Sequence, residues 1–110
     1  MKVVVYCTVD WQDKTIRGRT LDLSYGGAFI ATEANIVPPK GASVTVKVGL
    51  ATIEGAVEEE LDSTIIHTIP EIAEESRLAC FGVKFTEPIQ KVRDKLEPVF
   101  RAFALDQQGN

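Results

Sequence analysis

The chain has 110 residues, of which 45% are hydrophobic and 25% are charged, which fits a single domain able to bury a core without metal or disulfide staples. Its net charge of −4 conceals an acidic block, because residues 48–76 hold eight acidic residues and no Lys or Arg, and this argues against a DNA- or RNA-binding surface. The N-terminus lacks the features of a signal peptide and no apolar run could cross a bilayer, so we expect a cytoplasmic protein without membrane insertion.

The first two predicted strands form a hairpin. Residues 2–11 alternate between apolar and other side chains, which is the period-2 pattern of a half-buried strand. A polar turn separates them from a second strand at residues 15–23. In that strand Arg17 and Arg19 have the same parity as Leu23, so simple alternation places all three on one face.

The stretch between the second strand and a short third strand, which ends at Thr32, is expected to be a tight turn. Asp22 and Ser24 carry side-chain oxygens that can bond to nearby backbone N–H groups, and Gly27 can take backbone angles closed to other residues. One interpretation is a capped hairpin corner, in which Tyr25 is an exposed ring. The other is a ligand-binding surface, formed by a carboxylate acceptor, a hydroxyl group and glycine backbone that no side chain covers.

Three more strands are predicted at residues 43–50, 51–60 and 77–86. Residues 61–76 are less regular, because they combine apolar residues with an acidic run. They fit either an extended hairpin with a long tip or a loop carrying one helical turn that begins at Pro70.

The chain ends in a predicted amphipathic helix at about residues 88–105. Thr86 can cap it and Pro88 suits its first turn, while Pro98 should kink or break it near Glu97. Residues 106–110 are expected to be a frayed tail. Six short strands and one helix predict an all-β fold with a terminal helix, a small antiparallel barrel or sandwich in one domain of residues 1–105.

Catalytic and metal chemistry find little support in the sequence. His67 is the only histidine and lies near acidic residues, without a serine or cysteine partner at a recognisable spacing. Cys7 and Cys80 are far apart, and we expect both to be reduced thiols. We therefore predict no enzyme activity, no metal site and no cofactor.

The motifs together resemble the PilZ domain family, bacterial receptors for cyclic di-GMP. The family's motif of Asp or Asn, any residue, Ser, any two residues and Gly is present as Asp22-Leu23-Ser24-Tyr25-Gly26-Gly27. The run Gly82-Val83-Lys84-Phe85 resembles the family's last barrel strand, which a helix follows. The resemblance implies a six-stranded antiparallel β-barrel at about residues 2–86 and a C-terminal α-helix.

The resemblance also implies a ligand and roles for the motif residues. Cyclic di-GMP would be a regulatory ligand at the Asp22–Gly27 turn. Asp22 would accept hydrogen bonds from a guanine edge, Ser24 would donate to a phosphate or fix the turn, and Gly27 would let the backbone approach the ligand. Arg17 and Arg19 are candidate contacts to phosphate.

The family's second motif, R-x-x-x-R ahead of the first barrel strand, does not occur before that strand in this sequence. In the family this motif supplies arginines to phosphate and guanine, and members without it act as adaptors. Two functions are therefore expected. One is a receptor that binds cyclic di-GMP and relays the signal to a protein partner. The alternative is a nucleotide-independent adaptor that acts by protein–protein contact in motility, pilus or signalling machinery.

Overall fold

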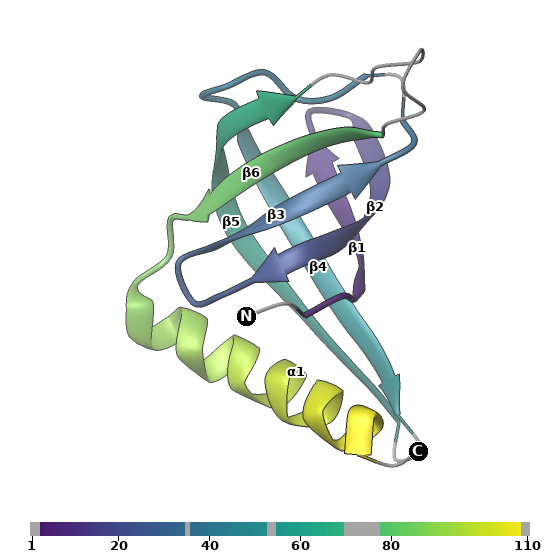
Figure 1. The fold of residues 1–110 in the computed structure, drawn as a ribbon. Coiled ribbons are helices and arrows are strands. Elements are labelled where there is room, and N and C mark those ends of the chain that lie inside the picture. Colours follow the sequence, from purple (N-terminus) through teal and green to yellow (C-terminus); the bar gives the residue numbers. More distant parts are fainter. Residues whose placement is uncertain (1–2, 35, 53–54, 70–77, 109–110) are drawn as a thin grey trace.

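Six antiparallel strands form a closed barrel in the order β1-β2-β3-β6-β5-β4, and a helix follows them (Figure 1). The computed structural model describes residues 3–34, 36–52, 55–69 and 78–108. The elements are β1 (Tyr6–Trp11), β2 (Lys14–Leu23), β3 (Gly27–Thr32), β4 (Ser43–Thr52), β5 (Gly55–Ile69), β6 (Ala79–Phe85) and α1 (Ile89–Gln108). The predicted fold is confirmed, and closure of the sheet excludes the sandwich.

The core follows from alternation along the strands. Successive side chains of a strand point to opposite faces, so every second residue of β1 and β4 enters the barrel. The apolar residues at these positions are buried, and Phe81 of β6 is the largest fully buried side chain. Barrel closure leaves no open sheet edge among these strands.

The fifth strand is longer than predicted. β5 pairs with β4 from Gly55 to Thr64 and with β6 from Ser63 to Ile69, so residues 61–69 match the extended-hairpin interpretation. A register shift between Ile65 and His67 interrupts the second pairing. The helical turn proposed to begin at Pro70 lies outside the described residues.

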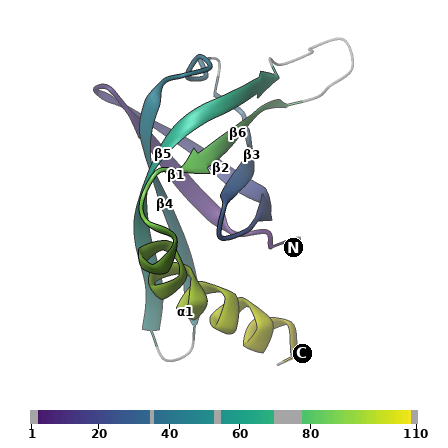
Figure 2. The ribbon, with the colours of Figure 1, turned by 90° about the vertical axis from the view of Figure 1, so that its left-hand side faces the viewer.

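Helix α1 lies across one end of the barrel (Figure 2). It buries Val92, Leu96 and Val99, the stripe expected from helical spacing. Of the kink or break predicted near Glu97, the break does not occur, because the helix continues through Pro98, which lies on its exposed side. Burial of the neighbouring apolar residues outweighs the hydrogen bond that a proline cannot donate.

The helix also ends later than predicted. It continues to Gln108, so residues 106–108 of the expected frayed tail are helical. No helix among the described residues is both long enough and apolar enough to cross a membrane.

Glu87 fixes the start of α1 to β5. Its carboxylate accepts hydrogen bonds from the Asp62 amide at 2.7 Å and from Lys95 Nζ at 2.8 Å. Burial alone would raise the pKa of Glu87, but the bonds from Lys95 and the amide outweigh burial and lower it. The predicted cap at Thr86 is wrong, because the Thr86 hydroxyl forms no hydrogen bond with any described residue. The Thr86 amide donates to the Asp62 carbonyl at 2.9 Å.

A Glu87→Gln variant should lower the free energy of unfolding at neutral pH by about 2 kcal/mol, because it removes the charged acceptor. The folded-state pKa of Glu87 lies below its unfolded value. Its stabilisation is therefore complete above the unfolded pKa and is lost as the pH falls through the folded pKa. Urea titrations at several pH values should show the difference from wild type shrinking in acid.

The matched control is Glu97→Gln. Glu97 forms an exposed pair with Arg101 at 2.9 Å, and such pairs contribute only about 0.5 kcal/mol. A Glu87→Gln effect that stayed constant from neutral to acidic pH would contradict the assignment of the stabilisation to the carboxylate.

Candidate functional site

Ser24 closes the turn between β2 and β3. Its amide donates to the Gly27 carbonyl at 2.9 Å, and its hydroxyl accepts from the Gly26 amide at 3.3 Å. The hydroxyl also lies 3.3 Å from the Gly27 carbonyl, to which it can donate. The side chain remains exposed. Ser24 therefore holds the corner together while its hydroxyl stays accessible to a ligand.

Gly27 is required by the approach of β3 to β6. A Cβ at this position would lie 2.1 Å from the Val83 carbonyl oxygen, well inside contact distance. Its φ is not positive, so the requirement is for space rather than for an unusual backbone angle. Gly26 differs, because a Cβ there would have only Ser24 Oγ within 4 Å, at 3.8 Å.

A β-bulge lies immediately before the turn. Thr20 pairs with Ile30, whereas the next pair in the ladder joins Asp22 to Phe29. Leu21 is therefore an extra residue on β2, and alternation shifts by one position after it.

The bulge places Asp22 on the outer face of the barrel with Arg17 and Arg19. All three side chains are exposed, whereas Thr20 and Leu23 are buried. The predicted alternation, which put Leu23 on the arginine face, is wrong beyond Thr20 because it assumed an unbroken strand. The structure thus brings the acidic and basic candidate residues to one surface.

Asp22 begins a row of outward-facing residues across four strands. The ladder places Asp22 beside Phe29, then Gly82, then His67. Since Gly82 has no side chain, Phe29 and His67 both approach the position where its Cβ would be, at 3.8 and 3.6 Å. Lys84 pairs with Gly27 in the neighbouring row.

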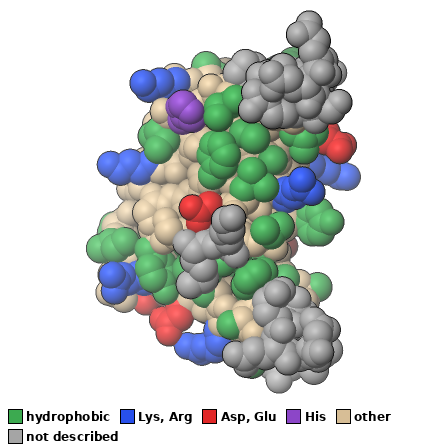
Figure 3. Space-filling model, in the orientation of Figure 1, with side chains coloured by type: hydrophobic (Ala, Val, Ile, Leu, Met, Phe, Trp, Pro, Cys, Tyr) green, Lys and Arg blue, Asp and Glu red, His purple; other side chains and the backbone are tan. Residues whose placement is uncertain are grey.

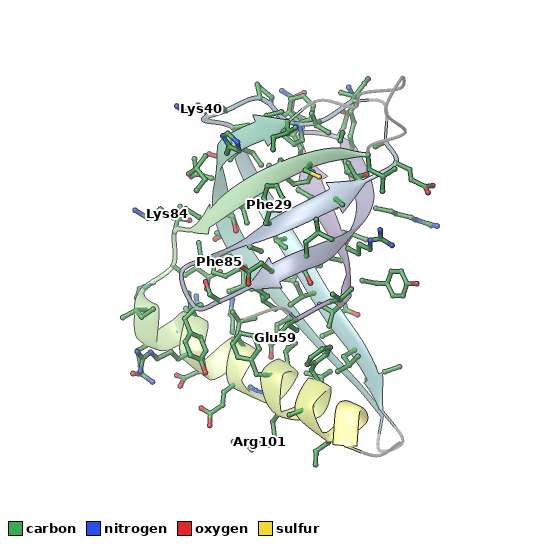
Figure 4. The ribbon with its side chains drawn as sticks, in the orientation of Figure 1. Phe29, Lys40, Glu59, Lys84, Phe85 and Arg101 are labelled. Atoms are coloured by element: carbon green, nitrogen blue, oxygen red, sulfur yellow. The ribbon has the colours of Figure 1, made fainter. Side chains whose placement is uncertain are left out.

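Figure 3 shows apolar side chains gathered over this face and basic side chains around its margins. Figure 4 shows Phe29 outside β3 and Lys84 pointing away from the barrel. Sequence reasoning did not single out Phe29 as a site residue. Phe29 is identified as a site residue by its pairing with Asp22, which follows the bulge in β2. The sequence of β2 alone does not reveal that bulge.

A cleft of about 630 Å³ extends along the same surface between β1, β2 and β3. Its lining includes Tyr6, Arg17, Arg19 and Thr32. Neither guanidinium forms an ion pair in the part of the chain that the structure describes. The same cleft is also lined by Glu33, so it carries two guanidinium groups and one carboxylate. The two guanidinium groups can bind an anion.

Tyr25 connects the turn to helix α1. Its ring packs edge-on against Phe100, with centroids 5.2 Å apart, and the Arg93 guanidinium lies 5.4 Å from its centroid. The expectation of an exposed ring is therefore wrong, since Tyr25 is partly buried against the core cluster. A displacement of the turn changes a packed contact with the helix.

The segment before β1 lies against β2 just ahead of the bulge. The Thr20 hydroxyl donates to the Val3 carbonyl at 2.5 Å and accepts from the Val5 amide at 3.0 Å. The Thr20 amide donates to the Val5 carbonyl at 2.9 Å. These bonds hold Val3 and Val5 against Thr20, which precedes Asp22 by two residues in β2.

The thiol near this surface and the described acidic and histidine side chains bear on reactive and metal chemistry. Burial raises the pKa of Cys7 to about 12, which keeps this thiol protonated and unreactive. No group of three or more His, Cys, Asp or Glu within the described ranges could hold a metal ion. The surface presents a carboxylate, a ring and two guanidinium groups, which are suited to binding.

Comparison with known proteins adds the family and a structural neighbour. The sequence profile of the PilZ domain matches residues 1–100. The structure of the Bacillus subtilis inhibitor of motility, MotI/DgrA, superimposes with a TM-score of 0.71 at 15% sequence identity. The match covers 92% of this chain and 47% of that protein, so this chain spans about half of its length. No curated protein matches the sequence.

Proposed function

This chain belongs to the PilZ domain family, and from that membership we propose that it binds cyclic di-GMP on the outer face of β2 and β3. PilZ domains are typically receptor or adaptor domains rather than enzymes. One observation carries the proposal: the bulge at Leu21 brings Asp22 onto the face that holds Arg17 and Arg19. That surface combines a hydrogen-bond acceptor for guanine with cations for phosphate.

Each group has a defined role in this proposal. The Asp22 carboxylate accepts hydrogen bonds from two adjacent N–H groups on a guanine edge. The Phe29 ring, which is paired with Asp22, offers a surface on which a base can stack. Arg17 and Arg19 neutralise the phosphates, and the Ser24 hydroxyl donates to a phosphate oxygen at the turn.

The route from ligand to partner passes through Tyr25. A ligand held by Asp22 and Ser24 acts on the turn, and the contacts of Tyr25 with Phe100 and Arg93 connect that turn to α1. A ligand that favours one position of the turn therefore favours one packing of α1. The exposed side of α1 is the surface that a protein partner would bind.

A nucleotide-independent adaptor is the second candidate. The fold itself uses Ser24 in the turn and Gly27 in the contact with β6, so both motif residues are explained without a ligand. The structural neighbour is an inhibitor of motility, which is compatible with control through protein contact. In this case the barrel serves as a scaffold for α1 and its partner.

Calorimetric titration of the chain with cyclic di-GMP tests the proposal. Wild type should bind, and Asp22→Ala should bind about 5- to 150-fold more weakly, because a bidentate contact to a base contributes about 1–3 kcal/mol. The matched control is Asp13→Ala, which removes an exposed carboxylate in the β1–β2 turn and should leave the affinity unchanged.

Two results would count against this function, and they differ in meaning. Absence of binding by folded wild type would exclude the receptor and leave the adaptor. Binding by Asp22→Ala at the wild-type affinity would exclude this location for the ligand.

A further inference from the structure

A second outer surface lies on β2, β1, β4 and β5, which are consecutive in the barrel. We call it the four-strand face. Cross-strand pairing arranges its outward residues in rows. In the first row Arg19 pairs with Tyr6, Gly49 pairs with Glu58, and Tyr6 and Gly49 line one cleft. The second row contains Arg17, Thr8, Lys47 and Glu60, which are paired in sequence across the four strands.

Charge is distributed unevenly along these rows. β2 contributes Arg17 and Arg19, whereas β5 contributes Glu58 and Glu60, so each row is basic at one end and acidic at the other. Lys47 lies between them and pairs with Glu60 at 3.6 Å. Arg17, Arg19 and Glu58 form no ion pair with any described residue.

The face also has a projection and a hollow at its centre. Tyr6 is 83% exposed, the most exposed of the large hydrophobic side chains that the structure describes. Beside it, Gly49 has no side chain, and a cleft of about 370 Å³ is lined by Tyr6, Gly49, Arg17 and Glu58. An aromatic ring left in water next to an open hollow is the kind of feature that contacts between proteins bury.

One twofold rotation matches these features between two copies. It brings the projecting ring of each copy to the hollow of the other, and the basic end of each row to an acidic end. A twofold axis parallel to the strands, between β1 and β4, places β2 of one copy opposite β5 of the other. In the first row this brings Arg19 to Glu58 and Tyr6 to Gly49, once in each direction. The second row follows the same rule and brings Arg17 to Glu60.

We propose that the four-strand face binds a second copy of this chain as a symmetric dimer. A twofold interface must be complementary to itself, and the rows have this property in both shape and charge. An acidic peptide would satisfy the arginines but leave Glu58 facing like charge, so the face favours a second copy. This inference does not require nucleotide binding, but it uses the Arg17 and Arg19 side chains that the proposed function assigns to phosphate, so a bound nucleotide and a second copy would compete for them. Association is therefore measured without nucleotide.

Charge reversal with rescue provides the test. The acidic variant combines Arg17→Glu with Arg19→Glu, and the basic variant combines Glu58→Arg with Glu60→Arg. Each variant alone should lose the dimer, because like charges then meet across the axis. An equimolar mixture should form a heterodimer, since glutamates of one chain then meet arginines of the other at both ends.

Sedimentation equilibrium over a range of protein concentrations gives the readout. Wild type should approach twice the 12.1 kDa mass of the chain, each variant should stay at the single mass, and the mixture should return to the double mass. Circular dichroism melts identify any variant that fails to fold. Rescue in the mixture separates a lost contact from a general defect, because misfolded chains would not restore one another.

Tyr6→Ser is an independent variant that changes no charge. It should weaken wild-type association at least severalfold, because the ring no longer fills the hollow over Gly49. Wild type at the single mass at every concentration would overturn the proposal. So would a mixture of the two folded charge variants that stayed monomeric.

Discussion

Replacing Gly27 with alanine should lower the free energy of unfolding by about 3 kcal/mol. The new Cβ would lie 2.1 Å from the Val83 carbonyl oxygen and 3.3 Å from Lys84 Cα. Both are backbone atoms of β6, so no side chain can rotate away. The clash can be relieved only by separating β3 from β6, whose ladder begins with the Gly27–Lys84 pair.

Gly26→Ala is the matched control. A Cβ there would have only Ser24 Oγ within 4 Å, at 3.8 Å, and should change stability by less than about 0.5 kcal/mol. Urea-induced unfolding followed by circular dichroism measures both variants. Equal stability of the two would mean that β6 does not approach Gly27 as closely as described.

This result bears on how the motif is interpreted. If Gly27 is required for the barrel, then a Gly27 variant that fails to bind cyclic di-GMP has lost its fold rather than a ligand contact. Asp22 is exposed on the outer face, so its replacement does not disturb the core. Asp22→Ala is therefore the variant that tests the ligand, whereas Gly27→Ala tests the architecture.

The strands could be predicted where alternation is unbroken. Val44, Val46 and Val48 alternate with polar residues, and β4 has close to the predicted bounds, with the core on the predicted side. Alternation fails at the two register shifts. Leu21 reverses the facing of the end of β2, and the shift after Ile65 made the long β5 look irregular. Each bulge is defined by pairing with a neighbouring strand, β3 for Leu21 and β6 for the shift after Ile65. The alternation of one strand by itself does not contain that pairing.

For the candidate site, the motif could be recognised from the sequence, whereas the residues packed around it could not. Asp22, Ser24 and Gly27 could be recognised because the motif is local. The contact of Tyr25 with Phe100 depends on the placement of α1 across the end of the barrel, which no local pattern contains. The same holds for Pro98, because burial of neighbouring residues, rather than the proline itself, decides whether the helix continues.

The start of the chain provides a second test of large effect. Thr20 is fully buried, and its hydroxyl serves the Val3 carbonyl and the Val5 amide together. Thr20→Val keeps the shape but removes both bonds and leaves two buried polar groups without a partner. The variant should lose about 2–4 kcal/mol of unfolding free energy.

Hydrogen exchange locates this loss. The Val5 amide should exchange much faster in Thr20→Val than in wild type, while amides of β4 should change only with global stability. Thr45→Val is the control, because the described contacts give its hydroxyl no hydrogen bond. An unchanged Val5 amide would mean that Thr20 does not hold this segment. A selective loss of its protection would mean that one buried hydroxyl holds the segment before β1 against β2. That segment would then be anchored two residues from Asp22, the residue proposed to contact the ligand.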